Sequence, residues 1–274
     1  MKKKANVLQI IIVTLIGALL LGACGKSVAS DTKEESTTIK VSTVSIPHAE
    51  ILEEITDDLA ADGVELELSI LSDGVQSNQQ TADGQFDVNF FQHTPYLEQV
   101  NEDSGLDLVE VAGVHIEPFG VYSRQIDSID DLSDKAKVSI PKDPVNFSRA
   151  LELLAANDVI ELDEEMQGDY TLEDITKNEK DLEFIAVDSE LLVHSLDDVE
   201  VAAINTNYAL EGDFNPMEDA LIIEGNESPY VNILVARPDN QEEEAIQILM
   251  KHLKSDKVKE FIEEEYDGAV VPAF

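Results

Sequence analysis

Strand-like and helix-like segments alternate along most of this 274-residue chain, and the alternation limits the folds it can adopt. A β-branched run at 38–46 is followed by a helical pattern at 48–61 and a second strand signal at 64–71. Five further strand signals, each trailed by a helical segment, continue the rhythm: 86–90, 106–114, 137–140, 182–187 and 199–204. Such alternation predicts an α/β fold with largely parallel sheets.

Two strand signals interrupt this rhythm, at 119–123 and 230–237, and helices with acidic first turns follow the second one, at 241–253 and 256–266. We interpret the layout as two lobes, with crossings near Pro118 and Tyr230. A ligand would bind in the cleft between the lobes, beyond the carboxyl ends of the strands. The expected division is a signal peptide at 1–23, a flexible leash at 24–37, lobe one at 38–118 plus 230–274, and lobe two at 119–229.

The N-terminus has the pattern of a secretory signal. Three lysines precede an apolar run from Val7 to Ala23, which is shorter than the roughly 20 residues that a spanning helix needs. Cys24 is the only cysteine, so an internal disulfide is excluded. The sequence LGAC around it resembles a bacterial lipobox, whose cysteine is acylated. We therefore expect a protein anchored by lipid to the extracytoplasmic face of the cell membrane, held by two or three acyl chains because one chain binds weakly.

The charge of the chain argues against several functions. It has 58 Asp and Glu against 18 Lys and Arg, so its field repels phosphate backbones, and nucleic acid is not expected as a partner. The acidity is typical of a solvated surface suited to saline surroundings, and no acidic run has the spacing of a calcium loop. The five histidines fall in no paired ligand spacing. We expect no metal, no cofactor and no catalytic residues.

Aromatic and polar side chains gather after the strand signal at 86–90. Thr94 and Pro95 predict a helix start, with Thr94 as N-cap. Phe91, His93 and Tyr96 then cluster at a strand-to-helix turn. These rings either wall a binding site or pack an ordinary core, with His93 a satisfied turn residue.

A second loop follows the strand at 137–140. Asp143 can cap a helix that begins at Pro144, and Asn146 and Arg149 then share one face of its first two turns. An arginine so close to a helix N-terminus is poorly placed for the helix dipole. Its guanidinium could instead clamp a carboxylate. The alternative is a surface ion pair, with Glu152 or another acidic residue.

Three other places offer polar groups at the ends of strands or at the crossings. The loop after 199–204 carries Asn205, Asn207 and Tyr208, of which Asn207 has the pattern of an N-cap. Amide oxygens and a carboxylate close to a clamping arginine would suit an α-ammonium group. The remaining polar residues flank the two crossings: His115, Glu117, Tyr230 and Asn232.

Taken together, these loops resemble a known family. Six segments occur in the same order behind the lipobox: FFQHTPYLEQ, VHIEPFGVYS, IPKDPVNFSRALELL, SLDDVEVAAINTNYAL, SPYVNILV and GAVVPAF. They are similar to the methionine-binding lipoproteins of bacterial ABC importers, from roughly Thr38 to Phe274. The resemblance implies a two-lobed, periplasmic-binding-protein-like (type II) fold. It also implies delivery of methionine to an ABC permease and its ATPase, by a protein that we expect to be a monomer.

The resemblance also implies roles for individual residues. Phe91, His93 and Tyr96 would wall the thioether pocket, and polarizable sulfur does make favourable contacts with aromatic edges. Arg149 would bind the α-carboxylate. The backbone end of the ligand would be held by Asn146, Asn205 and Asn232, and His115 and Tyr230 complete the expected ligand-binding set.

The sequence departs from the family pattern at three places. Gly74 stands where relatives commonly carry an aromatic residue, so we expect space in the pocket wall. Phe147 either occupies part of this space or is an exposed helix residue. Phe147-Ser148 replaces an acidic-glycine pair, and Thr206 replaces a common glycine. The ligand could therefore be methionine, a methionyl dipeptide or another apolar amino acid. A surface adhesion lipoprotein, which would retain no small molecule, is the main alternative function.

Overall fold

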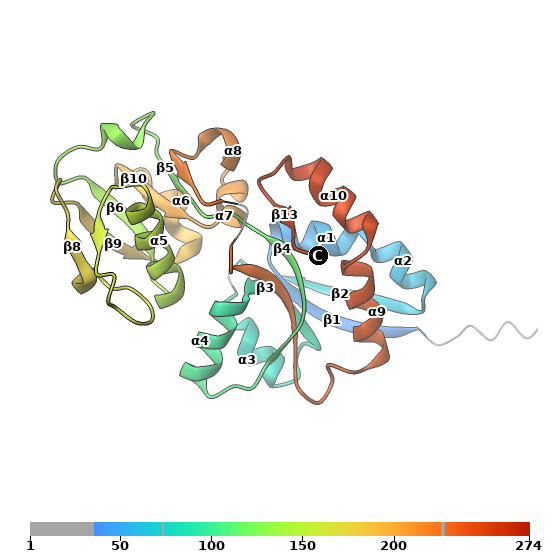
Figure 1. Ribbon diagram of the computed structural model, residues 1–274. Coiled ribbons are helices and arrows are strands. Elements are labelled where there is room, and N and C mark those ends of the chain that lie inside the picture. The colour runs from blue at the N-terminus through green and yellow to red at the C-terminus, as the bar shows by residue number, and fades with distance from the viewer. Residues whose placement is uncertain (1–35, 73, 226–227) are drawn as a thin grey trace, which may run out of the picture. The chain divides into compact units, whose positions relative to one another are not determined.

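The computed structural model describes residues 36–72, 74–225 and 228–274, and its strands form two large sheets (Figure 1). The signal segment, Cys24 and most of the expected leash lie outside the described residues. The first sheet has six strands in the order β13-β4-β12-β3-β1-β2. Their bounds are β1 (Thr37–Thr43), β2 (Val64–Ile70), β3 (Val88–His93), β4 (Val109–Ile116), β12 (Val231–Ala236) and β13 (Val271–Pro272).

The second sheet has five strands in the order β11-β5-β10-β6-β9. Their bounds are β5 (Gly120–Tyr122), β6 (Lys137–Pro141), β9 (Glu183–Val187), β10 (Val201–Ile204) and β11 (Ile222–Ile223). A separate hairpin pairs β7 (Glu161–Leu162) with β8 (Ile175–Lys177). The α/β, two-lobed fold class is thus confirmed, with one sheet in each lobe.

The expectation of largely parallel sheets is wrong, because both sheets are mixed. Pairs β1–β2, β1–β3, β6–β9 and β6–β10 are parallel. By contrast, β12 runs antiparallel to both β3 and β4, and β5 runs antiparallel to β10 and β11. Helical crossovers impose parallel pairing only on consecutive strands of one sheet. Strands β5 and β12 arrive from the other lobe, so no such crossover sets their direction.

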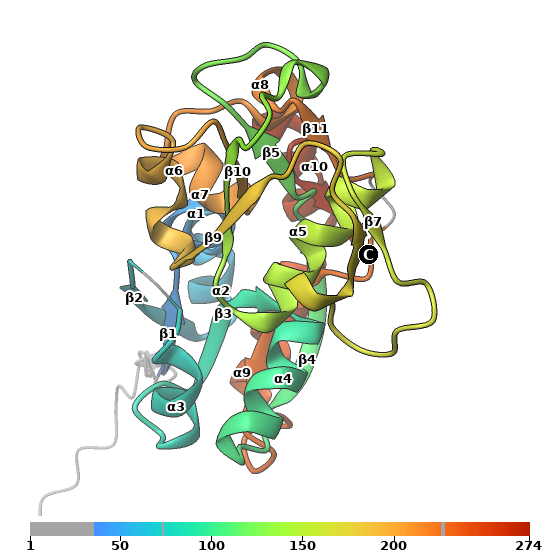
Figure 2. The same ribbon diagram turned by 90° about the vertical axis from the view of Figure 1, so that its left-hand side faces the viewer.

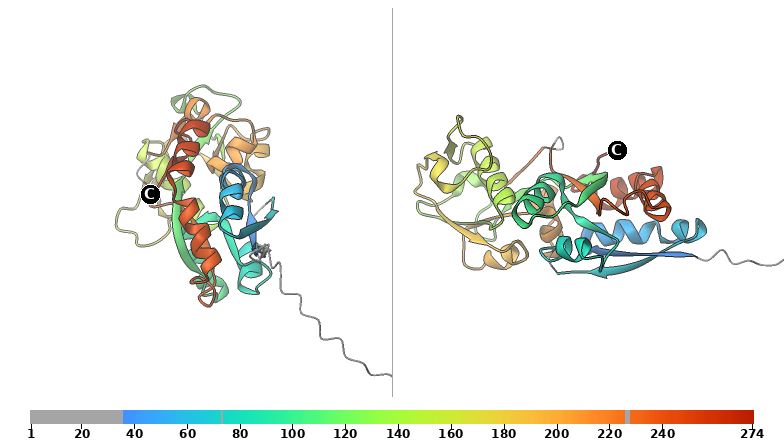
Figure 3. Two further views of the ribbon diagram at one scale, coloured as in Figure 1. Left: turned by 90° about the vertical axis from the view of Figure 1, so that its right-hand side faces the viewer. Right: turned by 90° about the horizontal axis from the view of Figure 1, so that it is seen from below.

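Helices cover both faces of the first sheet. One face carries α1 (Glu50–Glu54), α2 (Thr56–Ala61), α9 (Glu244–Leu253) and α10 (Asp256–Tyr266), and Figures 1 and 3 show the last two beside the first two. Leu52, Leu249 and Ile262 pack there against Val41 and Phe90. The other face carries α3 (Ser77–Ala82) and α4 (Thr94–Ser104). The sequence predicted one helix at 48–61, but the structure has two, α1 and α2, which are separated at Ile55. A helical turn at Ser45–Ala49 precedes them.

The second sheet is also covered on both faces (Figure 2). Helix α5 (Pro144–Ala156) packs Leu151 and Leu154 against one face, to which β10 contributes Val201 and Ala203. The other face carries α6 (Leu192–Ser195) and α7 (Thr206–Glu211), against which the alternate residues of β10 pack. This two-residue alternation is the ordinary geometry of a strand buried on both sides. The smaller elements are α8 (Pro216–Asp219) and 3-10 turns at Ile129–Asp131, Leu172–Asp174 and Ser189–Leu191.

The chain passes from the first sheet to the second between Ile116 and Gly120, and it returns between Ile223 and Val231. We propose 38–118 plus 230–274 and 119–229 as the two lobes because strand membership changes in these segments. No helix within the described residues is both long enough and apolar enough to cross a bilayer.

Candidate functional site

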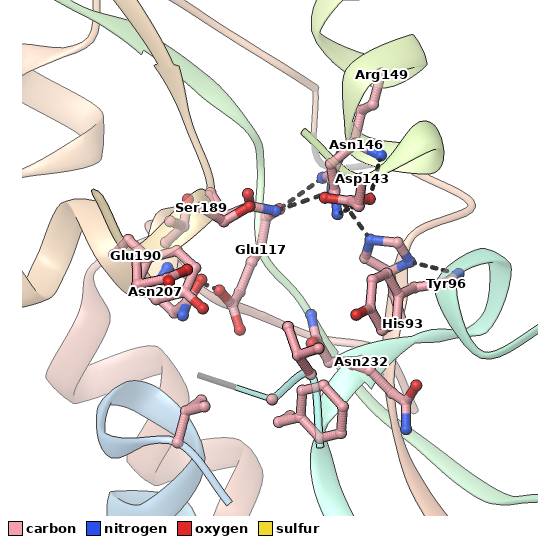
Figure 4. A pocket seen from close by; sticks show the side chains of 18 of the residues that line it. His93, Tyr96, Glu117, Asp143, Asn146, Arg149, Ser189, Glu190, Asn207 and Asn232 are labelled. Atoms are coloured by element: carbon pink, nitrogen blue, oxygen red, sulfur yellow. Dashed lines mark hydrogen bonds between the residues drawn. The ribbon is translucent and has the colours of Figure 1, made fainter. Parts of the chain in front are cut away.

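A cavity of about 400 Å³ is lined by both lobes (Figure 4). Lobe one contributes residues after β1 and β2 and at and after the end of β3, and lobe two contributes the loops after β6, β9 and β10. Glu117 and Asn232, beside the crossings, also line the cavity. The volume falls within the range of roughly 300 to 1,000 Å³ typical of small-molecule sites.

His93 joins the two lobes at the cavity wall. It is the N-cap of α4, and its Nδ1 accepts the N–H of Tyr96 at 3.2 Å, so the expected cap, Thr94, is wrong by one residue. With Nδ1 accepting, Nε2 carries the proton and donates to Oδ1 of Asn146 at 3.1 Å. Burial lowers the pKa of His93 to about 3, with the charge of Arg149 as the next cause. The ring is therefore neutral near pH 7.

The start of α5 is as expected, with Asp143 as N-cap and Pro144 first in the helix. Oδ1 of Asp143 accepts both the backbone N–H and the side-chain amide of Asn146, at 2.9 and 3.0 Å. Oδ1 of Asn146 in turn accepts from His93 and from Nδ2 of Asn205, the latter at 3.1 Å. Asn146 thus links lobe one to two loops of lobe two. Most of its hydrogen-bonding capacity is used within the protein.

Arg149 is buried rather than paired at the surface, and its partner is not Glu152. Its Nε and Nη2 donate to the two carboxylate oxygens of Glu224 at 2.7 and 2.6 Å. Nη2 also donates to the backbone oxygen of Glu117 at 2.9 Å. The guanidinium lies 4.0 Å from the ring centroid of Tyr230, a cation–π distance. These contacts use three of its five N–H groups, and the two on Nη1 have no hydrogen-bond partner among the described residues.

Aromatic rings form the wall on the side of lobe one. Phe91 and Tyr96 meet edge to face, with centroids 6.2 Å apart, and both line the cavity. The expected space at Gly74 is absent, because the Phe91 ring occupies the position beside that residue. Phe147 neither fills the pocket nor stands exposed. It packs, half-buried, against the core of lobe two.

Glu117 is the centre of a buried polar cluster at the first crossing. Its Oε1 lies 2.8 Å from Nε2 of His115 and 3.5 Å from Nε2 of His48. Its Oε2 accepts the backbone N–H of Asn207 at 2.9 Å. Nε2 of His48 also lies 3.1 Å from Oδ1 of Asn232.

The potential ligand atoms of His48, His115 and Glu117 lie within 4.8 Å of one another, which is close enough to hold a metal ion. Histidines that bind metals nearly always donate their other ring N–H to a partner. Here Nδ1 of both rings is buried and has no hydrogen-bond partner in the described part of the chain. The second shell of a metal site is missing, so this geometry fits a hydrogen-bonded cluster better than a metal centre.

Most of the residues expected from the sequence lie at the cavity, but two do not line it. Phe91, His93, Tyr96, Asn146, Arg149, Asn205 and Asn232 do. His115 is fully buried behind Glu117, and Tyr230 stacks on the guanidinium of Arg149 from outside the cavity. Asn207 is not the N-cap of α7, since that position belongs to Asn205. Asn207 lies in the first turn instead and donates its N–H to Glu117.

Sequence reasoning missed two important residues. Glu224, which orients Arg149, has no motif around it that points to a site. His48 sits in a helical turn where its partners, at 115–117 and 232, are distant in sequence. Only the rarity of histidine, five in the whole chain, could have marked it.

Comparison with known proteins gives consistent results. A family model described as NlpA lipoprotein matches residues 39–274. The methionine-binding lipoprotein MetQ of Bacillus subtilis is 39% identical over 94% of this chain and 97% of its own. A nutrient binding protein from Burkholderia cenocepacia, solved bound to methionine, is 36% identical with a TM-score of 0.83, over 86% of this chain and 100% of the other. An ABC transporter periplasmic substrate-binding protein from Coxiella burnetii is 34% identical with a TM-score of 0.82, over 86% of this chain and 100% of the other.

Proposed function

The chain belongs to the NlpA lipoprotein family, and on that premise we propose that it is the extracytoplasmic binding protein of an ABC importer, with methionine or a closely related amino acid as its ligand. The observation that carries the proposal is the ordered guanidinium of Arg149 at the wall of a cavity lined by amides and aromatic rings. Relatives named as methionine-binding lipoproteins support the same reading.

Each end of such a ligand has a matching group. The two N–H groups on Nη1 of Arg149 suit a carboxylate, and a charged hydrogen bond is stronger than a neutral one. Asn205 and Asn232 offer amide groups for the backbone end. Phe91 and Tyr96 present ring edges to a thioether, and His93 fixes the turn that carries them. Asn146 acts mainly through the bridge between the lobes.

Membrane attachment and partners are part of the same proposal. Cys24, outside the described residues, would carry the lipid and hold the protein on the extracytoplasmic face of the cell membrane. A monomer would deliver the ligand to a permease with its ATPase, as the ABC transporter context of the Coxiella burnetii relative suggests.

Mass spectrometry of small molecules released from the purified protein, followed by calorimetric titration, tests the proposal. We expect methionine to co-purify or to bind in preference to other amino acids, and to raise the unfolding temperature by mass action. A methionyl dipeptide that binds more tightly than every free amino acid would revise the ligand. A protein that neither retains nor binds any small molecule would favour an adhesion role.

A further inference from the structure

The carboxylate of Glu117 is a buried anion at the cavity wall. The residue is only 6% exposed, and Figure 4 shows its side chain among those of the cavity lining. One carboxylate oxygen accepts from His115 and the other from the N–H of Asn207. A carboxylate has about four acceptor positions, so roughly two remain for a ligand.

The two histidines beside Glu117 supply hydrogen bonds without positive charge. In each ring the Nε2 atom faces an acceptor, Glu117 for His115 and Asn232 for His48. In each ring Nδ1 has no hydrogen-bond partner within the described residues. Protonation at Nε2 alone therefore satisfies the buried N–H groups and leaves only acceptors unpaired, which is the less costly arrangement. Burial lowers the pKa of His48 to about 4 and of His115 to about 3, so both rings are neutral near pH 7.

Within the described residues, no lysine or arginine forms an ion pair with Glu117. The side chains of Glu117 and Arg149 do not pair directly: the guanidinium binds the carboxylate of Glu224 and reaches only the backbone oxygen of Glu117. Burial raises the pKa of Glu117, as expected for a carboxyl whose charge is uncompensated. A buried carboxylate is stabilised most by a partner cation.

We propose that Glu117 binds the ammonium group of the ligand, so that the cavity takes amino acids with a free α-amino group and rejects analogues without one. The inference deepens the proposed function, on which it rests for the other end of the ligand. Nη2 of Arg149 donates to the backbone oxygen of Glu117 at 2.9 Å, so the residue proposed to hold the ligand's anion contacts the residue proposed to hold its cation. A molecule whose ammonium and carboxylate share one carbon needs its two binding residues to be neighbours in this way. His115, whose Nε2 donates to the carboxylate of Glu117, is a positioning residue.

The test is a calorimetric titration of the wild type and of Glu117→Gln with three probes: L-methionine, its desamino analogue 4-(methylthio)butanoate, and 3-(methylthio)propylamine, which keeps the ammonium and lacks the carboxylate. We expect the wild type to bind methionine about 10- to 100-fold more tightly than the desamino analogue. In Glu117→Gln the affinity for methionine falls by a similar factor while that for the desamino analogue stays the same. Glu98→Gln, which removes an exposed charge on α4, is the matched control and changes neither affinity.

The outcomes separate this inference from the proposed function. Equal binding of methionine and the desamino analogue by the wild type overturns the ammonium site, and this comparison needs no variant. Equal loss of both affinities in Glu117→Gln also overturns it, since a purely structural role predicts that result. If methionine does not bind but the amine binds and needs Glu117 to do so, methionine is not the ligand. The ammonium site is then retained. Binding of none of the three overturns both.

Discussion

The ring of Phe91 stands in the space that a side chain on Gly74 would need. A Cβ at position 74 would lie 2.0 Å from Cε2 and 2.1 Å from Cδ2 of that ring. Ordinary carbon contacts are about 3.5 to 4.0 Å. The absence of a side chain at Gly74 therefore permits the position of Phe91, and it does not leave a gap in the pocket wall.

We expect Gly74→Ala to displace the Phe91 ring and to weaken methionine binding by up to about tenfold. The reason is the loss of a sulfur–aromatic contact that contributes about 0.3 to 1.5 kcal/mol. Calorimetry of Gly74→Ala, Phe91→Ala and the double variant forms a double-mutant cycle. Because the first change acts through the ring, it should have little further effect once the ring is gone. Full additivity in the cycle would contradict this coupling.

Arg149→Ala should weaken amino acid binding by about 10- to 100-fold or more, since hydrogen bonds to charged groups contribute about 1.5 to 3 kcal/mol. The structure adds a cost in stability, because the change leaves Glu224 without its cation. Breaking a buried ion pair costs about 3 to 5 kcal/mol, although the partly accessible Glu224 should reduce this figure.

Two further variants separate binding from stability in this experiment. Arg149→Gln combined with Glu224→Gln removes both charges and should restore much of the stability but not the affinity. Arg124→Ala breaks an exposed pair with Asp197 and should change neither quantity measurably. Wild-type affinity in Arg149→Ala, measured by calorimetry, would refute the role of Arg149 in binding the carboxylate.

Asn146→Ala should lower the free energy of unfolding by about 1 to 3 kcal/mol. It removes the acceptor shared by His93 and Asn205 and leaves two donors unsatisfied. A change of that size shifts the unfolding temperature of a domain this large by about 2 to 4 °C per kcal/mol. Asn157→Ala, at the exposed end of the same helix, is the control and should have a smaller effect. Equal shifts in the two variants would argue against the bridge.

Stability should fall as the pH falls from 7 to 5. An unfolded histidine titrates near pH 6.5, whereas burial lowers the folded pKa of His48 to about 4 and of His93 and His115 to about 3. Below pH 6.5 the unfolded chain therefore binds more protons, and the free energy of unfolding decreases. The raised pKa values of Glu117 and Asp143 act in the opposite sense and reduce the slope.

Denaturant titrations at the two pH values measure this effect, for which we expect a net loss of about 2 to 5 kcal/mol. His93→Gln should show a shallower pH dependence than the wild type. His194→Gln, which changes an exposed histidine, should keep the wild-type slope. Equal or greater stability at pH 5 would show that the buried carboxyls dominate.

Cys24→Ala should leave unprocessed precursor and abolish metabolic labelling by a fatty acid. The motif LGAC, followed by a polar stretch, is the basis of this expectation. The labelling experiment needs only the full-length chain and its variant. Unchanged labelling would mean that the lipid is attached elsewhere or not at all.

Local patterns in the sequence determined much of this protein. The helix expected at 256–266 has those bounds in the structure, and α5 begins at Pro144 under the cap of Asp143. The loops after β3, β6 and β10 were identified as places where functional residues gather, and they meet at one cavity. Periodicity, caps and turn residues act over a few positions, so one sequence is enough to reveal them.

Only the tertiary structure decided which distant groups meet. Glu224 reaches Arg149 across 75 residues, His48 reaches Asn232 across 184, and the Phe91 ring fills the space at Gly74. The mixed direction of the strands was also set at this level, by chain crossings between lobes. Such contacts depend on how whole layers pack and on which buried charges and donors find partners. No local pattern encodes them, because the partners adjoin only after both lobes have folded.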